Sequence, residues 1–189
     1  MHKVWVSTLA LTLAACGGSG SGNSAHNAAI TLTNVSEAEL AKQVETIKAQ
    51  TQIQPGAWEY QAEIVSVDLP GVPEPMRSQA IEELTRPQPA LKQCVTPGSS
   101  IASNPALLQA VGKDCVYQKY ALGNGRIELA ATCKGSEGQP VTATLTGTYS
   151  GSQADFLLKQ HIAAPAGQPG AEDLALRIKS RRTGDCPKS

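Results

Sequence analysis

The sequence predicts a mainly β protein, with about seven strands in a curved antiparallel meander sheet or a partly open barrel. Three observations support this fold class. Apolar residues recur at every second position in several segments between residues 57 and 182. Glycine-containing turns separate these segments, and only one long segment, near residues 35–50, shows the spacing of an amphipathic helix.

The strands are expected where apolar and polar side chains alternate, because successive side chains of a strand point to opposite faces. In the first strand the apolar positions are Trp58, Tyr60, Ala62 and Ile64. Further strands are expected near 90–95, 115–122, 126–133, 140–150, 154–163 and 173–182, with turns at 123–125, 135–139 and 150–152.

The segment Val35 to Gln50 predicts an amphipathic helix. Ser36 can cap it and Glu39 follows three residues later, which is the spacing of a capping box. Leu40, Val44 and Ile47 then form one apolar stripe. We expect the stripe to pack on the sheet, although a stripe of this kind can also bind a partner.

Two other segments have weaker signals. Residues 70–89 hold five prolines and predict a long loop with one helical turn at 77–84. Asn104-Pro105 starts a short helix near 105–111, which Gly112 ends.

Residues 1–15 are expected to be a signal peptide, because Lys3 precedes an apolar run of twelve residues, too short for the roughly 20 that span a bilayer. Leu13-Ala14-Ala15-Cys16-Gly17 resembles the bacterial lipobox, so we expect cleavage before Cys16 and transfer of a diacylglyceryl group to its thiol, with palmitate as an acyl chain of the anchor. An ordinary secretory signal is the alternative, but Leu13 is large for its −3 position.

The predicted organisation is a lipid-anchored flexible tether at 16–34, rich in glycine, serine and asparagine, followed by one disulfide-bonded domain at 35–189. The lipid anchors the chain to a membrane of the cell envelope, facing the periplasm. Gly17 resembles the outer-membrane sorting signal of enteric lipoproteins and so favours the outer over the inner membrane.

Composition excludes some partners. Removal of residues 1–15 leaves 15 basic and 16 acidic residues, so no basic excess attracts nucleic acid. One tryptophan, one phenylalanine and four tyrosines remain, too few to suggest a base-stacking surface.

Four cysteines remain once Cys16 carries lipid, and an even number in an exported protein predicts two disulfides. A three-residue loop at 123–125 sets Cys115 opposite Cys133, which leaves Cys94 to pair with Cys186. Shifting the register by one residue packs the apolar side chains better, so we expect a β-bulge to satisfy both ends of the hairpin. There is no C-x-x-C pair and His161 is the only histidine of the domain, so neither a metal site nor a cofactor is expected.

Several short motifs occur in a characteristic order. They are Pro55-Gly56-Ala57-Trp58-Glu59, Gln93-Cys94-Val95-Thr96-Pro97, Cys115 and Cys133, Gly147-Thr148-Tyr149-Ser150-Gly151, and Arg181-Arg182-Thr183-Gly184-Asp185-Cys186-Pro187. In these motifs the chain resembles the bacterial domain-of-unknown-function 3617 family over about residues 53–188. The resemblance implies a small exported or lipid-anchored protein and supplies no catalytic residue. The loop at 70–89 and the helix at 36–50 depart from the family pattern.

No catalytic constellation is visible, so we do not expect an enzyme. His161 has no partner motif, and the acidic pairs Glu82-Glu83 and Glu172-Asp173 are expected to be solvated loop charges. Arg177, Lys179 and Arg181 place a basic strip on one face of the last strand, usually a solvated face and in a minor alternative a contact for lipid phosphate.

Two functions are therefore weighed. The first is an envelope module that binds an apolar ligand or a protein partner on its concave sheet face, with Trp58, Tyr60, Leu145 and Tyr149 facing the ligand. The second is a structural lipoprotein whose own side chains fill the core. Small residues at inward positions (Ala62, Ala131, Ala143, Gly147) favour the first. A hydrolase is a distant third.

Cys16→Ser tests the lipid anchor. We expect the variant, expressed in a diderm host, to remain uncleaved or to become soluble, because the thiol that accepts the lipid is lost. Membrane fractionation and the mass of the mature N-terminus are the measurements. A variant that still matures and stays with the membranes would contradict the prediction.

Overall fold

The computed structural model describes residues 29–102, 111–135, 137–164 and 170–187. Within these residues the chain forms one antiparallel sheet of nine strands and two α-helices. The strands, in chain order, are β1 Ile30–Leu32, β2 Val35–Ser36, β3 Gly56–Asp68, β4 Leu91–Val95, β5 Lys113–Gly123, β6 Arg126–Lys134, β7 Pro140–Tyr149, β8 Gln153–Ile162 and β9 Glu172–Gly184.

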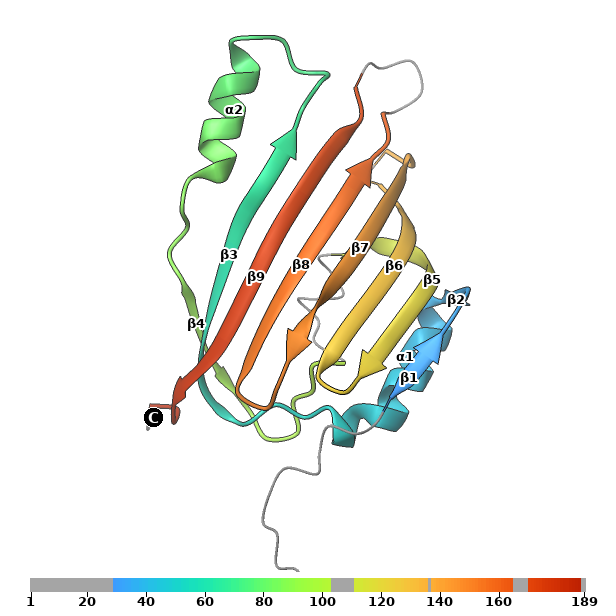
Figure 1. Ribbon diagram of the computed structural model, residues 1–189, viewed down its shortest axis with the longest axis vertical. Coiled ribbons are helices and arrows are strands. Elements are labelled where there is room, and N and C mark those ends of the chain that lie inside the picture. The colour runs from blue at the N-terminus through green and yellow to red at the C-terminus, as the bar shows by residue number, and fades with distance from the viewer. Residues whose placement is uncertain (1–28, 103–110, 136, 165–169, 188–189) are drawn as a thin grey trace, which may run out of the picture.

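The strands β5 to β9 form a meander in which each strand pairs with the next. The last strand, β9, then pairs with β3, and β4 pairs with the other edge of β3 (Figure 1). At the opposite end of the sheet β1 and β2 pair with β5. In this described part β1 and β4 do not meet, so the sheet is open rather than a barrel. The predicted mainly β antiparallel fold is confirmed.

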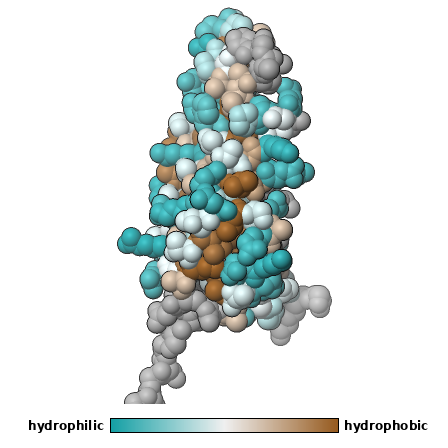
Figure 2. Space-filling model, turned by 90° about the vertical axis from the view of Figure 1, so that its right-hand side faces the viewer, coloured by the Kyte–Doolittle hydropathy of each residue, from teal (hydrophilic) through white to brown (hydrophobic). Residues whose placement is uncertain are grey.

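The sheet begins earlier in the chain than the sequence suggested. Ile30–Leu32, which fell within the predicted tether at 16–34, pairs with Tyr120 to Leu122 of β5. The reason is a short alternation of Ile30 and Leu32 with threonines, whose apolar side chains become half-buried at the sheet edge. From the side of β1, β2 and α1, apolar surface gathers at the level of α1 and β1 (Figure 2).

The predicted N-terminal helix is present as α1, Glu37–Ile47, followed by a 3₁₀ turn at Lys48–Gln50. The Ser36 hydroxyl accepts a hydrogen bond from the Glu39 backbone N–H at 3.3 Å, so Ser36 caps the helix as expected. Leu40, Val44 and Ile47 are buried against the sheet, which is the apolar stripe that the sequence predicted.

The proline-rich loop contains more helix than expected. A helix of ten residues, α2 at Met76–Thr85, lies beside the half of β3 that β4 does not pair with (Figure 1). None of its residues is buried, so it lacks the apolar stripe that indicates an amphipathic helix in a sequence. Local contacts hold it, including the hydrogen bond from the Ser78 hydroxyl to the Glu74 carboxylate at 2.8 Å. The short helix predicted near 105–111 lies outside the described residues except for Val111, which is fully buried.

The hairpin of β5 and β6 resolves the conflict between its two registers. Its turn has two residues, Asn124 and Gly125, both with positive φ, and not the three that we expected. Near the turn Leu122 faces Ile127, which is the better-packed register. A register shift at Gln118 then moves the pairing by one residue, so the predicted bulge is present. Beyond it Cys115 and Cys133 form a buried disulfide with Cα atoms 4.0 Å apart.

We call the face of the sheet that carries Trp58, Leu129, Leu145 and Leu158 the inner face, and the opposite one the outer face. The core lies between the inner face and chain segments that cover it, namely α1, residues 51–53, residues 95–102 and Val111. Thr51 and Ser100 are buried within this cover, and their hydroxyls hydrogen-bond each other at 2.6 Å. Each fully buried large apolar side chain contributes about 1.5–3 kcal/mol, so burial of Leu145 and its neighbours strongly favours folding.

Tyr120→Phe is expected to stabilise the protein. The Tyr120 side chain is 1% exposed and its hydroxyl has no hydrogen-bond partner among the described residues. A buried hydroxyl without a partner costs about 1–3 kcal/mol, so removing it should raise the free energy of unfolding by about 1 kcal/mol. Urea denaturation measures the change, with Tyr117→Phe as the control, since the Tyr117 hydroxyl is not a buried orphan. A loss of stability in Tyr120→Phe would show that the hydroxyl is satisfied.

The same variant changes the pH dependence of stability. Burial raises the pKa of Tyr120 above its ordinary value near 10. As the pH rises above about 10, the unfolded chain releases this proton first and the free energy of unfolding falls. In Tyr120→Phe that decline should be shallower, which denaturation curves between pH 9 and 11, roughly the titration range of tyrosine, can measure.

Candidate functional site

Three of the four residues expected to face a ligand are core residues instead. Trp58 is 2% exposed, Leu145 is 0% and Tyr149 is 6%. The Trp58 indole N–H donates to the Gln54 carbonyl at 2.8 Å, and its ring stacks with that of Tyr60. Of the small inward residues, Ala131 and Ala143 are also buried in this core. At Gly147 the Phe156 ring of the next strand occupies the space where a side chain would be.

Tyr60, the fourth predicted residue, lies on a part of the inner face that the described covering segments bury less completely. It faces Leu91 on β4, while Ala62 and Ile64 face Ile178 and Leu176 on β9. Leu91 is 63% exposed, Ala62 is exposed, and the other side chains are half-buried. We call these six residues the inner-face strip. Its members are Tyr60, Ala62, Ile64, Leu91, Leu176 and Ile178.

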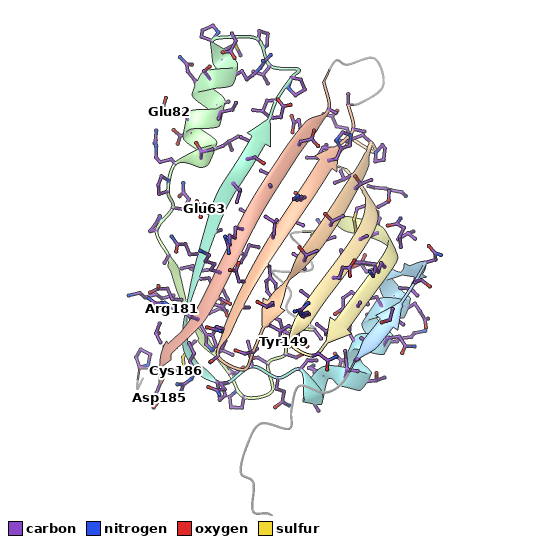
Figure 3. The ribbon with its side chains drawn as sticks, viewed as in Figure 1. Glu63, Glu82, Tyr149, Arg181, Asp185 and Cys186 are labelled. Atoms are coloured by element: carbon purple, nitrogen blue, oxygen red, sulfur yellow. A yellow bond between two sulfur atoms is a disulfide. The ribbon has the colours of Figure 1, made fainter. Side chains whose placement is uncertain are left out.

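The second disulfide joins Cys94 to Cys186 and crosses over β3. Ala57 pairs with Cys94 on one side and with Gly184 on the other, so the link passes over a strand that carries only a methyl group there. Figure 3 shows Cys186 and Asp185 at the corner of the sheet where the chain ends. The two disulfides therefore have the pairing expected from the sequence.

Hydrogen bonds fix the same corner. The Arg182 guanidinium donates to the Pro55 carbonyl at 2.8 Å and pairs with Asp185. The Thr183 hydroxyl donates to the Ala57 carbonyl at 3.2 Å. The Gln54 N–H donates to the Gly151 carbonyl at 2.7 Å, and this bond connects the β7–β8 turn to the corner. Four of the sequence motifs therefore meet at this corner of the sheet. Residues of each motif hold the corner together through strand pairing, hydrogen bonds or the disulfide.

A groove of about 540 Å³ lies next to this corner, in the range of small-molecule sites. It is lined by Glu59, Gln61, Thr148, Tyr149, Ser150, Gln153, Ala154, Asp155, Lys179, Ser180 and Arg181. The charged members point to the outer face, because they alternate along β3, β8 and β9 with buried or half-buried neighbours of the inner face.

Two ion pairs organise the groove. Arg181 contacts Glu59 at 2.9 Å across β9 and β3, and Arg177 contacts Asp155 through two hydrogen bonds of 2.9 and 2.7 Å. The bonds from Arg177 hold the pKa of the Asp155 carboxyl below its usual value. Figure 3 shows Arg181 on β9 and Glu63 on β3 along this part of the sheet.

From the sequence, only the basic residues of this groove could be predicted. The basic strip of Arg177, Lys179 and Arg181 was visible in the alternation of the last strand. Its partners on β3 and β8 were not, because the pairing of β9 with β3 joins residues as far apart as Glu59 and Arg181. Knowledge of the pairing of β9 with β3 would have predicted the contact between Glu59 and Arg181.

The remaining sequence candidates do not gather into a site. His161 and Asp173 lie on the outer face, 2.8 Å apart across β8 and β9. Among the described residues no group of three or more histidine, cysteine or acidic side chains is arranged to hold a metal ion. Cys16 lies outside the described residues. In the described part of the chain, no helix is both long and apolar enough to cross a bilayer.

Comparison with known proteins gives one result. The model of a family described as "Protein of unknown function (DUF3617)" matches residues 53–186. No curated protein and no solved structure matches the chain.

Gly56→Ala should strongly destabilise the corner. Gly56 has a φ of +136°, and an added Cβ would lie 2.3 Å from the Gly184 carbonyl oxygen. We expect a loss of about 3 kcal/mol or more in the free energy of unfolding, from backbone strain and from separation of β3 and β9. Gly98→Ala is the control, because its φ is also positive (+84°) but nothing lies within 4 Å, so about 1 kcal/mol is expected. Urea denaturation with intact disulfides measures both. Equal losses would contradict the role given to the close approach.

Proposed function

The chain belongs to the DUF3617 family, and we propose that it is a non-enzymatic, lipid-anchored envelope protein that binds an apolar acyl chain on its inner-face strip. The observation that carries this proposal is the contrast between the two faces of the same strands. Tyr60, Ala62 and Ile64 are aromatic or aliphatic although solvent reaches them, whereas the residues between them on the outer face, Gln61 and Glu63, are polar.

The contrast continues on the neighbouring strand. On β9 the inner face carries Leu176 and Ile178, while the outer face carries Arg177 and Lys179. A solvated surface tolerates charge, so apolar side chains that stay partly exposed need another reason. An apolar ligand that covers them is such a reason, because burial of its surface and of theirs is favourable.

The size of the strip favours an acyl chain over a protein partner. From Tyr60 to Ile64 a strand extends about 13 Å, and the three strands β4, β3 and β9 span about 10 Å. A stable protein interface uses about 20–30 residues a side. Six side chains, none of them charged, suit one or two hydrocarbon chains better. The expected lipid anchor at Cys16 would keep the protein at a membrane, where such chains are abundant.

The alternative is a structural lipoprotein with a filled core. The burial of Trp58, Leu145 and Tyr149 favours it for the central part of the inner face. It offers no reason for the exposure of Leu91 and Ala62. The two proposals therefore differ in what contacts these two residues in the native envelope.

Photocrosslinking in the envelope distinguishes them. A benzophenone amino acid at Ala62 should form adducts with lipid acyl chains, because it lies on the inner-face strip. The matched control is the same substitution at Ser66, which is exposed on the outer face of the same strand. The measurement is the mass of the peptide that carries the photoreactive residue, from full-length protein crosslinked in intact cells.

Lipid adducts at residue 62 and not at residue 66 support the proposal. Adducts of residue 62 with an envelope protein would contradict the acyl-chain proposal and indicate a protein partner instead. An absence of adducts at residue 62, with normal folding, would leave the structural alternative.

A further inference from the structure

Among the described residues, the outer-face groove contains one cation, Lys179, that makes no ion pair within 4.0 Å, although Asp155 lies near enough to interact with it electrostatically. Glu59 is engaged by Arg181, and both oxygens of Asp155 are engaged by Arg177. Lys179 lies between these two arginines on β9. Within the described residues no carboxylate oxygen lies within 4.0 Å of its ammonium group. An anionic group of a ligand can therefore approach Lys179 without displacing an existing ion pair.

Neutral hydrogen-bonding groups surround this cation. The register places Gln61, Lys179, Asp155 and Thr148 in one row across β3, β9, β8 and β7. Gln153 lies one row further, opposite Arg181. The side chains of Gln61, Gln153 and Thr148 are exposed and make no hydrogen bond to any part of the chain that the structure describes. Amide and hydroxyl groups of this kind bind the hydroxyls of a ligand.

The lining also excludes one class of phosphorylated ligand. The only aromatic residue in it is Tyr149, whose side chain is 6% exposed in the core. The groove therefore has no ring on which a nucleobase could stack. Its volume of about 540 Å³ exceeds what a bare phosphate would fill and suits a ligand the size of one or two sugar rings.

We propose that this groove binds a sugar phosphate, with the phosphate on Lys179 and the ring hydroxyls on Gln61, Gln153 and Thr148. The site lies on the opposite face of the sheet from the inner-face strip, so it does not depend on the acyl-chain proposal. The shared chemistry is a phosphate monoester on a polyhydroxylated ring, which occurs both in soluble sugar phosphates and in the headgroups of envelope glycolipids.

Calorimetric titration of the full-length protein in detergent micelles tests the site. The probes are glucose 1-phosphate, glucose and inorganic phosphate. We expect saturable binding of glucose 1-phosphate, tighter than that of either fragment. Lys179→Met should weaken it about tenfold, because a charge-assisted hydrogen bond to phosphate is lost. The matched control is Lys159→Met, which removes an exposed lysine from the outer face of β8 outside the groove.

A second arm identifies the source of the ligand. Vesicles that contain a phosphorylated glycolipid replace the soluble probe, with vesicles of its dephosphorylated form as the control. Binding in either arm that Lys179→Met weakens and Lys159→Met does not supports the proposal. Binding in neither arm overturns it, as does equal weakening by the two variants. Inorganic phosphate that binds as tightly as the sugar phosphate would also overturn it, because the ring hydroxyls would then contribute nothing. The thermal midpoint of each variant, expected near that of the unchanged protein, verifies folding.

Discussion

A single open sheet must cover its apolar face with something other than a second sheet, and this constraint governs the whole molecule. Here the cover consists of α1, residues 51–53, residues 95–102 and Val111. These segments bury Trp58, Leu145 and Tyr149. They do not cover the end of the inner face where β3 meets β9, so Ala62 and Leu91 stay exposed. The inner-face strip is thus the part of the open sheet that the described segments leave incompletely covered.

The pairing of β9 with β3 is the second determinant, because it creates both candidate surfaces at once. On the inner face it aligns Ala62 with Ile178. On the outer face it brings Glu59 to Arg181. The adjacent pairing of β8 with β9 adds the contact of Arg177 with Asp155. The corner at Gly56, Ala57 and the Cys94–Cys186 disulfide fixes this pairing at one end. A groove lined by side chains from four paired strands is held more firmly than one built on loops.

Much of the fold could be predicted from the sequence, because period-two alternation and a capped amphipathic stripe are local signals. They located α1 and the strands from β3 onward, and hairpin geometry identified the disulfide partners. For α2, which buries nothing, local signals predicted only one helical turn. They missed β1, whose three residues gain their structure from pairing with β5. The candidate surfaces depend on which strand lies beside β3, a long-range fact that no local pattern encodes. The small inward residues favoured a ligand cavity in the sequence, but the space beside Gly147 is filled by Phe156.

The position of β9 has a consequence for the order in which the protein can fold. A chain synthesised from its N-terminus delivers β3 early and β9 after the other strands. Until β9 arrives, β3 can pair only with β4, and two strands alone are at best marginally stable in water. The hairpins β5 to β8 can form as they emerge, because their contacts are local. Completion of the sheet, and with it the link between Cys94 and Cys186, must wait until β9 and Cys186 have been synthesised.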